Sequence, residues 1–325
     1  MELITRPHSD MIVNSSEVEG LNKSSFIEAN TKKVTLQHLQ KDCIIPVFSK
    51  DNETTISHYQ FINTVFDYIK NEYKEFDIKT PDIRVSHHVK GRIPSAIGKP
   101  AKELLEHEKT LYYERCAFVI EIPGITKEIN GNKLSLSVGG VRSLAQENLY
   151  SKKTLEKFKV FIGFQNKVCL NLCISTDGLA NAIRIGSIVD LEQNIDVLFN
   201  NYNQGYHLET LNLMSDYYLT EKQFAHFVGK ARMYQHLSKS EQQGIFPLAL
   251  NDSQINSVVK QYYNCPNFGR ADNGDINLWN LYNLFTEANK SSYIDFNLER
   301  NVNAYELIEN LGKSLHTGTT NFFLA

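Results

Sequence analysis

Apolar and polar residues alternate along four stretches in the middle of the chain, and this pattern predicts four β-strands. The stretches cover residues 116–122, 134–141, 158–164 and 168–175. Asn130-Gly131 separates the first two, and this dipeptide favours a type I′ turn, which needs positive φ at both central residues. The second pair turns through residues 165–167. We therefore expect two consecutive hairpins in one antiparallel sheet.

The predicted strands have one strongly apolar face and one weakly polar face. The apolar face should contain Leu134, Leu136, Val138, Val168, Leu170, Leu172 and Ile174. The other face should contain Ser135, Ser137, Cys169, Asn171 and Cys173. Gly139 and Gly140 could let a phosphate approach the backbone closely, or a bulge at the end of the second strand would account for them.

Helical spacing of apolar residues occurs before and after the predicted sheet. Ser57 and Gln60 form a capping box ahead of a helix that should run to about Tyr73. Pro100 occupies the first turn of another predicted helix. In the C-terminal half, helices are expected over residues 188–203 and behind start signals at Thr220, Asn251, Asp272 and Asn301.

These elements predict an α+β fold, in which an antiparallel sheet (about residues 116–175) packs with an N-terminal helix and a helical C-terminal half. Residues 1–24 are polar and without period, so we expect a flexible arm there. No linker follows, which favours a single α+β domain over residues 25–325, sheet-rich to about residue 176 and helical after it. Residues 44–48 should form an edge strand, because Pro46 has no N–H to donate.

Composition and charge limit the classes of function. The 325 residues have a formal net charge of −3, which argues against a broadly basic nucleic-acid coat but permits a local basic patch. No run approaches the roughly 18 apolar residues of a membrane span, and we expect neither a signal peptide nor a membrane partner. The five cysteines have no zinc-binding spacing, so we expect reduced thiols and a cytoplasmic location.

Two groups of basic residues are candidates for binding nucleic acid. Residues 84–92 form the most basic stretch, in which Arg84, Lys90 and Arg92 could contact phosphates or could simply protect a sheet edge. Further along, a basic stripe on one helical face would follow a phosphate backbone or form the solvated side of an amphipathic helix. That stripe consists of Lys222, His226 and Lys230.

A metal site is the alternative that the carboxylates offer. Asp272 and Asp275, with Glu287, could hold Mg²⁺, although Asp residues at this position are also typical helix caps. The chain contains no P-loop and no GxGxxG, HExxH or GxSxG motif. We therefore expect no cofactor and assign no catalytic residue.

Residues 272–287 resemble the most recognisable segment of an uncharacterised family, a domain of unknown function, from Bacteroides-type bacteria and their mobile elements. Residues 91–94, 107–115, 158–169 and 232–237 are similar to the same family. A broader phage/plasmid-like protein family has a W-x-x-x-N-x-x-T-E run that is similar to Trp279, Asn283, Thr286 and Glu287. These likenesses imply a place among conjugative and phage genes and supply no mechanism.

Three functions remain open at this point. The first is a non-enzymatic protein that binds or anneals single-stranded DNA, with Tyr112 and Tyr113 as stacking platforms or core aromatics, and with a homo-oligomeric ring as a compatible assembly. The second is a metal-dependent enzyme acting on nucleic acid. The third is a structural or protein-binding role in phage or conjugation biology. We expect the Trp279 segment to be a buried structural element under all three.

Overall fold

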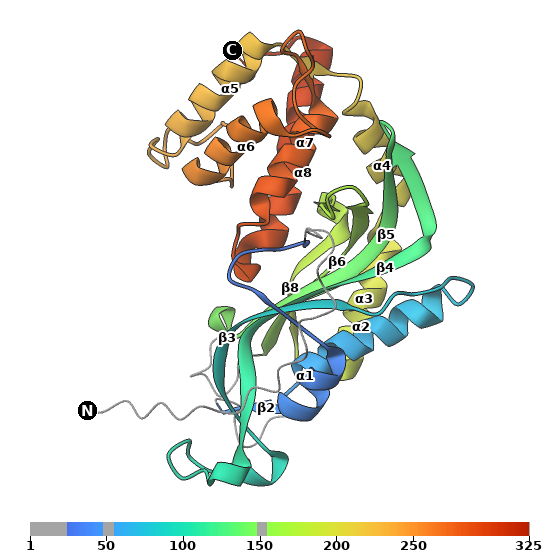
Figure 1. Cartoon of the computed structure of the whole chain (residues 1–325), viewed down its shortest axis with the longest axis vertical. Coiled ribbons are helices and arrows are strands. Elements are labelled where there is room, and N and C mark those ends of the chain that lie inside the picture. The colour runs from blue at the N-terminus through green and yellow to red at the C-terminus, as the bar shows by residue number, and fades with distance from the viewer. Residues whose placement is uncertain (1–24, 48–54, 148–154, 325) are drawn as a thin grey trace.

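An antiparallel sheet forms the centre of the computed structural model, which describes residues 25–47, 55–147 and 155–324 (Figure 1). The predicted arm at residues 1–24 lies outside the described residues. The strands are hydrogen-bonded in the order β1-β3-β4-β5-β6-β7, with β2 also on β3 and β8 also on β6. Their bounds are Lys32–Val34 (β1), Ile45–Pro46 (β2), Asp82–Arg92 (β3), Lys109–Ile129 (β4), Asn132–Ser143 (β5), Glu156–Asn166 (β6), Leu172–Cys173 (β7) and Leu179–Ile185 (β8).

The long hairpin of β4 and β5 forms as the sequence predicts. Asn130 and Gly131 have φ values of 46° and 73°, the left-handed conformation that the expected tight turn requires. The pairing shifts register between Ile122 and Thr126 of β4, and a shift of this kind bends a strand. The hairpin curls with the rest of the sheet in Figure 1.

Other parts of the sheet differ from the prediction. The fourth predicted strand, residues 168–175, is wrong in extent, since only Leu172–Cys173 pairs with β6. Leu170 has a φ of 58° and donates its N–H to the carbonyl of Asn166, so the chain turns there instead of extending. Strand β8 was not predicted at all. The basic stretch is strand β3, which pairs with β4 along its length and with β1 and β2 at its two ends on the other side.

The turn at Leu170 also changes which side chains share a face. Leu134, Leu136 and Val138 lie in the main core as predicted, but Cys173 lies there with them. Leu172 and Ile174 lie in a second core on the opposite side of the sheet. Ser135 and Ser137 are fully buried, so the face expected to be mildly polar is covered there and cannot hold a ligand.

The expected bulge at Gly139 and Gly140 is also wrong, because both residues pair in register with the strands on either side. Their lack of a side chain has a packing reason instead. A Cβ at Gly139 would overlap the carbonyl oxygen of Phe118, and a Cβ at Gly140 would lie 2.7 Å from the ring of Phe61. The close approach of a neighbouring backbone at Gly139, and of the Phe61 ring at Gly140, therefore requires both glycines.

Helices cover both faces of the sheet. Helices α1, α2 and α3 lie together on one side, and the remaining helices form a lobe from which α8 descends onto the other side (Figure 1). The bounds are Leu36–Asp42 (α1), His58–Glu72 (α2), Ile188–Asn201 (α3), Gln204–Leu213 (α4), Glu221–Tyr234 (α5), Asp252–Asn264 (α6), Leu278–Asn289 (α7) and Ile294–Thr317 (α8). A two-stranded ribbon pairs Tyr218–Leu219 (β9) with Ile276–Asn277 (β10), and single 3₁₀ turns lie at Pro94–Ala96, Glu106–Glu108, Leu144–Gln146 and Thr176–Gly178.

The capping signals locate most of the helices correctly. Ser57, Thr220 and Asn251 each form the reciprocal capping box with the glutamine three residues later. Helix α7, however, begins at Leu278 behind the cap Asn277, not at Asp272. The chain makes a turn at Gly274, where φ is 89°, and then forms the short strand β10 before the helix can start.

Two further helix predictions are wrong. Residues after Pro100 form only a turn, in which Glu103 donates to the carbonyl of Pro100, and a 3₁₀ turn then leads into β4. Helix α8 begins at Ile294, two turns before the predicted start at Asn301. Its cap is Tyr293, whose side chain makes no capping hydrogen bond, so no start signal appears in the sequence. In the described part of the chain, no helix combines the length and the apolar character needed to cross a membrane.

Candidate nucleic-acid interface

The face of the sheet that contacts α8 contains a concentration of basic side chains. Cross-strand partners point to the same side of a sheet, and register pairs Arg84 with Ala117, Ala117 with Val141, and Val141 with Lys159. Ala117 and Val141 belong to the second core, beneath α8. Arg84 and Lys159 therefore lie on the α8 side, and beyond Arg84 the row continues to Lys33 of β1, which is paired with Asp82.

The next row on the same face adds three more cations. Arg115 lies two residues before Ala117 on β4, and Lys157 lies two residues before Lys159 on β6, so both share the α8 side. Lys157 is paired directly with Arg184 of β8. These side chains form one basic face, which consists of Arg84, Arg115, Lys157, Lys159 and Arg184. The face extends across the sheet, in which neighbouring strands lie about 4.8 Å apart.

The first turn of α8 neutralises the centre of this basic face. Arg115 donates its Nε–H to Asp295 at 2.6 Å, and its guanidinium also contacts Glu114 at 2.8 Å. Lys159 donates to the backbone carbonyl of Asp295 at 2.6 Å and pairs with Glu299. Burial lowers the pKa of Lys159, and the carboxylate of Glu299 opposes that effect. These two cations are therefore held by the protein itself.

The flanks of the basic face are not neutralised in this way. Within the described residues, Arg84, Lys157 and Arg184 make no hydrogen bond or ion pair through their side chains, and the Nε of Arg84 is buried without a partner. Lys157 and Arg184 are like charges placed directly opposite each other, an arrangement that destabilises a sheet. On the opposite face, by contrast, the buried Arg142 is paired with both Glu147 and Glu156.

Two exposed aromatic side chains stand at the start of α8, the helix whose Asp295 and Glu299 contact the basic face. Tyr293 and Phe296 are each about half exposed, at 53% and 52%, and they flank Asp295 in the chain. No side chain caps this helix end. The candidate interface therefore consists of three cations without partners among the described residues and, at the start of the neighbouring helix, two aromatic rings open to solvent.

The structure divides the first basic group predicted from sequence. Arg84 lies on the basic face, and Lys90 is exposed near the far end of β3. Arg92 is only 2% exposed and donates to the carbonyl of Lys99, so it is not available to a phosphate. Tyr112 and Tyr113 are buried in the main core and cannot stack on bases.

The second predicted group lies on α5, as the helical spacing indicated. Lys222 and His226 are exposed on the side opposite the buried Phe224 and Phe227. Lys230 is half-buried and lies 4.7 Å from the ring centroid of Phe322. Figure 1 places α5 and β3 toward opposite ends of the molecule, so the structure does not bring the two predicted groups together.

The carboxylates of the alternative metal site are not assembled. Asp272 and Asp275 lie in the turn before β10, where Asp275 accepts from Asn273 at 2.8 Å, and neither residue caps a helix. Glu287 lies near the other end of α7 and pairs with Lys290 at 2.8 Å. Among residues 25–47, 55–147 and 155–324, no three His, Cys, Asp or Glu side chains are arranged to hold a metal ion.

The residues of the Trp279 motif connect α7 to the sheet. Trp279 is fully buried, as predicted. Asn283 is also buried, accepts from the side chain of Asn166 at 2.9 Å, and offers its carbonyl to Asn171 at 3.0 Å. Thr286 bonds to the carbonyl of Tyr282 within the helix. The two contacts of Asn283 hold the loop between β6 and β7 against α7.

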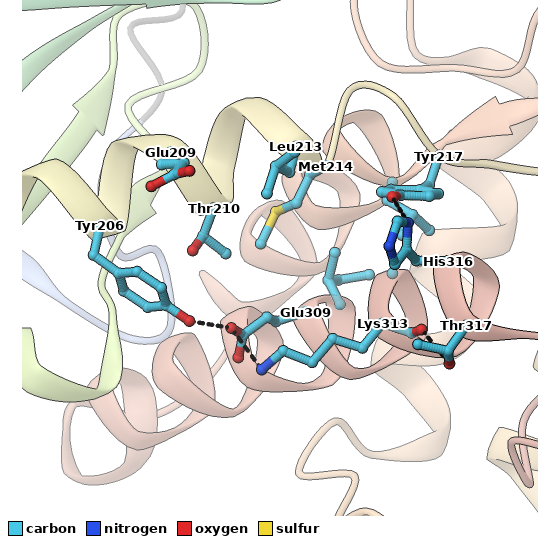
Figure 2. A pocket seen from close by; sticks show the side chains of 13 residues that line it. Tyr206, Glu209, Thr210, Leu213, Met214, Tyr217, Glu309, Lys313, His316 and Thr317 are labelled. Carbon is cyan, nitrogen blue, oxygen red and sulfur yellow. Dashed lines mark hydrogen bonds and ion pairs between the residues drawn. The ribbon is translucent and has the colours of Figure 1, made fainter. Parts of the chain in front are cut away.

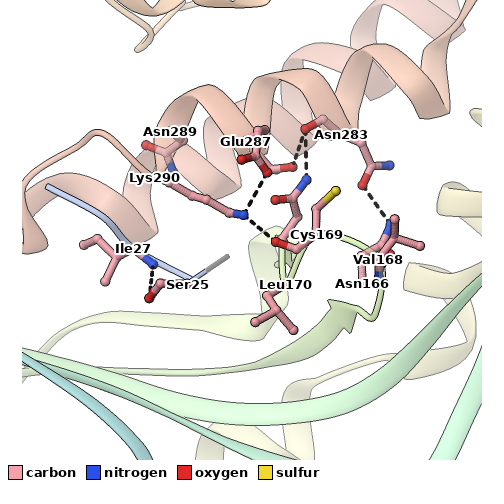
Figure 3. A network of polar contacts seen from close by, with 12 residues as sticks. Ser25, Ile27, Asn166, Val168, Cys169, Leu170, Asn283, Glu287, Asn289 and Lys290 are labelled. Atoms are coloured by element: carbon pink, nitrogen blue, oxygen red, sulfur yellow. Dashed lines mark hydrogen bonds and ion pairs between the residues drawn. The ribbon is translucent and has the colours of Figure 1, made fainter. Parts of the chain in front are cut away.

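Glu287 takes part in the same junction through a buried lysine (Figure 3). Lys290 is 2% exposed, bonds to the carbonyl of Cys169 in the loop, and is paired with Glu287. Its own carbonyl accepts from the backbone of Glu28 and Ala29. The motif residues thus hold α7 against the loop between β6 and β7. The sequence signal for the basic face was weaker, because its residues come from four strands that only the fold brings together.

The family comparison confirms the resemblance to an uncharacterised family and provides no link to mobile elements or to phage proteins. A family model described as "Domain of unknown function, B. Theta Gene description (DUF3871)" matches residues 8–324. The chain belongs to this family. The family description names no activity, ligand or partner. No curated protein and no solved structure matches the chain.

Proposed function

We propose that this member of the family binds or anneals single-stranded nucleic acid on the basic face beside the first turn of α8, without catalysis. The observation that supports the proposal most is the pair Lys157 and Arg184. Two unpaired cations directly opposite each other cost stability, and an anionic ligand would offset that cost. Phosphate groups bind Lys and Arg side chains of this kind, irrespective of base sequence.

The exposed aromatic residues favour single strands over duplexes. Stacking of a base on an aromatic side chain contributes about 1–3 kcal/mol and requires an unpaired base. Tyr293 and Phe296 are exposed at the start of α8, within three residues of Asp295, which contacts Arg115 and Lys159, so they are the stacking platforms in this proposal. With Arg84, Lys157 and Arg184 as the unpaired cations, we expect few phosphate contacts and modest affinity. In a plot of the logarithm of the binding constant against the logarithm of the salt concentration, each phosphate contact should add about −0.7 to the slope.

The biological setting that we propose follows from the resemblance to proteins of mobile elements. A cytoplasmic protein that binds or anneals exposed strands would act during transfer or repair of such DNA, and a homo-oligomeric ring is the assembly that we propose for it. A metal-dependent enzyme is less well supported, because Asp272, Asp275 and Glu287 are not arranged to share a metal ion. A purely structural or protein-binding role is the outcome that remains if nucleic acid does not bind.

Fluorescence anisotropy with a labelled single-stranded oligonucleotide tests the proposal. The test variant is Lys157→Glu with Arg184→Glu, which keeps a like-charged pair on the sheet while reversing its sign. The matched control is Lys222→Glu with Lys239→Glu, which changes the net charge equally at exposed positions at or beyond α5. We expect the wild type and the control to bind at low salt, and the test variant to bind at least tenfold more weakly.

Each other result has a definite meaning. Equal binding by a folded test variant would remove the basic face as the site. Loss of binding in the control alone would move the site to the stripe on α5. No binding by the wild type at low salt would remove the proposed function and leave the protein-binding role.

A further inference from the structure

A pocket of about 320 Å³ lies between α4 and the C-terminal half of α8 (Figure 2). Its floor is apolar, and it includes Leu213 and Met214 at the end of α4, Leu278 of α7 and Ile308 of α8. The volume is within the range of small-ligand sites, about 300–1,000 Å³. Leu213 is 46% exposed despite being a large apolar residue. The pocket is therefore sized for a small molecule with an apolar part.

The rim of the pocket is polar and ordered by hydrogen bonds (Figure 2). Tyr206 donates its hydroxyl to Oε1 of Glu309 at 2.9 Å, and Lys313 pairs with the same oxygen at 2.8 Å. On the other side, the hydroxyl of Tyr217 is 2.7 Å from Nδ1 of His316. A carboxylate and an ammonium group thus stand one helical turn apart above an apolar floor.

Both charged groups on the rim retain capacity for a ligand. The ammonium of Lys313 has three N–H donors, and its pairing with Glu309 accounts for one of them. The second carboxylate oxygen of Glu309 accepts no hydrogen bond from the described residues. The rim can therefore hold a cationic and an anionic group at the same time.

A glycine in the wall of the pocket has no packing explanation. Gly312 lies inside the long helix α8, where glycine is less favourable than alanine by about 1 kcal/mol. A Cβ at this position would make only ordinary contacts, 3.4 Å from Leu278 and 3.9 Å from Tyr217. Helix packing would therefore accept a side chain, and its absence leaves the space of the pocket open.

We propose that the pocket binds a free α-amino acid with an apolar side chain. The ammonium group of the ligand lies against Glu309, its carboxylate against Lys313, and its side chain on the apolar floor. A simple amine or a simple acid would satisfy only one of these two charged groups. The zwitterion matches both, and its neutral total charge matches a rim on which Glu309 and Lys313 cancel.

A matched series of ligands tests the charge requirement. We would measure thermal shift and calorimetric binding with L-phenylalanine and L-leucine, then with phenethylamine and 3-phenylpropionate, which each lack one charged group. The amino acids should raise the melting temperature, and the rise should continue with the logarithm of their concentration above the Kd. Loss of either charged group should weaken binding about tenfold or more, since a charge-assisted hydrogen bond is lost.

Variants locate the site. Gly312→Leu should fill the pocket and abolish the shift, while a more favourable helix residue at that position keeps the protein folded. The control is Gly229→Leu, which makes the same change on the exposed side of α5, where a Cβ meets nothing within 4 Å. Glu309→Gln should weaken the amino acids more than 3-phenylpropionate.

Three outcomes would overturn the proposal. One is the absence of any shift with both amino acids at millimolar concentration. Another is equal binding of phenethylamine or 3-phenylpropionate, which would mean that only one charge is recognised. The third is an unchanged shift in a folded Gly312→Leu variant, which would place the ligand elsewhere.

Discussion

Trp279 donates its indole N–H to the side chain of Asn132 at 2.7 Å, and this bond joins α7 to the first residue of β5. Asn132 directly follows the tight turn of the β4–β5 hairpin. The tryptophan is fully buried, so its N–H needs a partner inside the protein. The hairpin turn predicted from Asn130-Gly131 therefore also places the acceptor for the chain's one tryptophan.

Replacing Trp279 should show what this junction contributes to stability. Trp279→Ala should lower the free energy of unfolding by about 3–5 kcal/mol, because it removes a large buried side chain. Trp279→Phe should cost less, since it keeps a ring and loses the hydrogen bond to Asn132. Urea denaturation measures both values. Val168→Ala, at an exposed loop position, is the control and should change little. An unchanged melting temperature in Trp279→Ala would contradict a structural role.

A single charge reversal at Lys157 should move stability and binding in opposite directions. Lys157→Glu would replace a like-charged cross-strand pair with an attractive one against Arg184, worth about 0.2–1 kcal/mol. The melting temperature should rise slightly. Affinity for a single-stranded oligonucleotide should fall, because one phosphate contact is lost. A fall in both quantities would indicate that Lys157 has a structural role that its lack of partners does not reveal.

Acidification should destabilise the protein through two buried histidines. Burial lowers the pKa of His58 to about 3, helped by the charge of Arg142, and burial lowers the pKa of His207 to about 4. In the unfolded chain both titrate near 6.5. The unfolded state therefore binds more protons as the pH falls below 6.5, and stability should decrease from there toward pH 4.

His207→Gln separates this effect from the titration of carboxylates. The variant loses the contact of His207 with the hydroxyl of Tyr202, so it should be less stable at pH 7. Between pH 7 and 4.5, however, its loss of unfolding free energy should be smaller than the wild type's by on the order of 2–3 kcal/mol. Parallel curves for the two proteins would show that His207 does not remain neutral in the fold.

Metal ions should not affect stability. Asp272 and Asp275 lie in a turn, and Glu287 is engaged with Lys290. Addition of a chelator should leave the melting temperature unchanged, and Mg²⁺ should not raise it. A rise that grows with Mg²⁺ concentration is the signature of a bound ligand. Such a rise would return the metal-dependent enzyme to first place among the candidate functions.

The sequence was most informative where a local signal decides the structure. The turn at Asn130-Gly131 and the capping boxes at Ser57, Thr220 and Asn251 were all placed correctly, because each depends on residues within one turn. The start of α8 was missed because Tyr293 gives no capping signal and the packing on the sheet stabilises the first turns. The path after Asn166 was missed because contacts to Asn283 and Lys290 decide it, over 100 residues away.

The candidate interface shows the same limit. Of its unpaired cations, Arg84 belonged to a basic stretch and could be singled out, whereas Lys157 and Arg184 are isolated in the sequence and become neighbours only through pairing of β6 with β8. Two other residues that were predicted to bind nucleic acid make contacts inside the protein instead. Arg92 donates to the carbonyl of Lys99, and Lys230 lies over the ring of Phe322. Composition can indicate that cations exist, but only the strand register shows which of them share a surface.

Helix α8 has a consequence for how the molecule unfolds. Its 24 residues extend about 36 Å, and its first turns are buried on the sheet while its later turns pack among the other helices. The helix is continuous from the sheet to the lobe, so it couples the packing of the one to the packing of the other. We therefore expect the sheet and the helical lobe to melt in one cooperative transition. A protease cut within α8 should release no fragment that stays folded by itself.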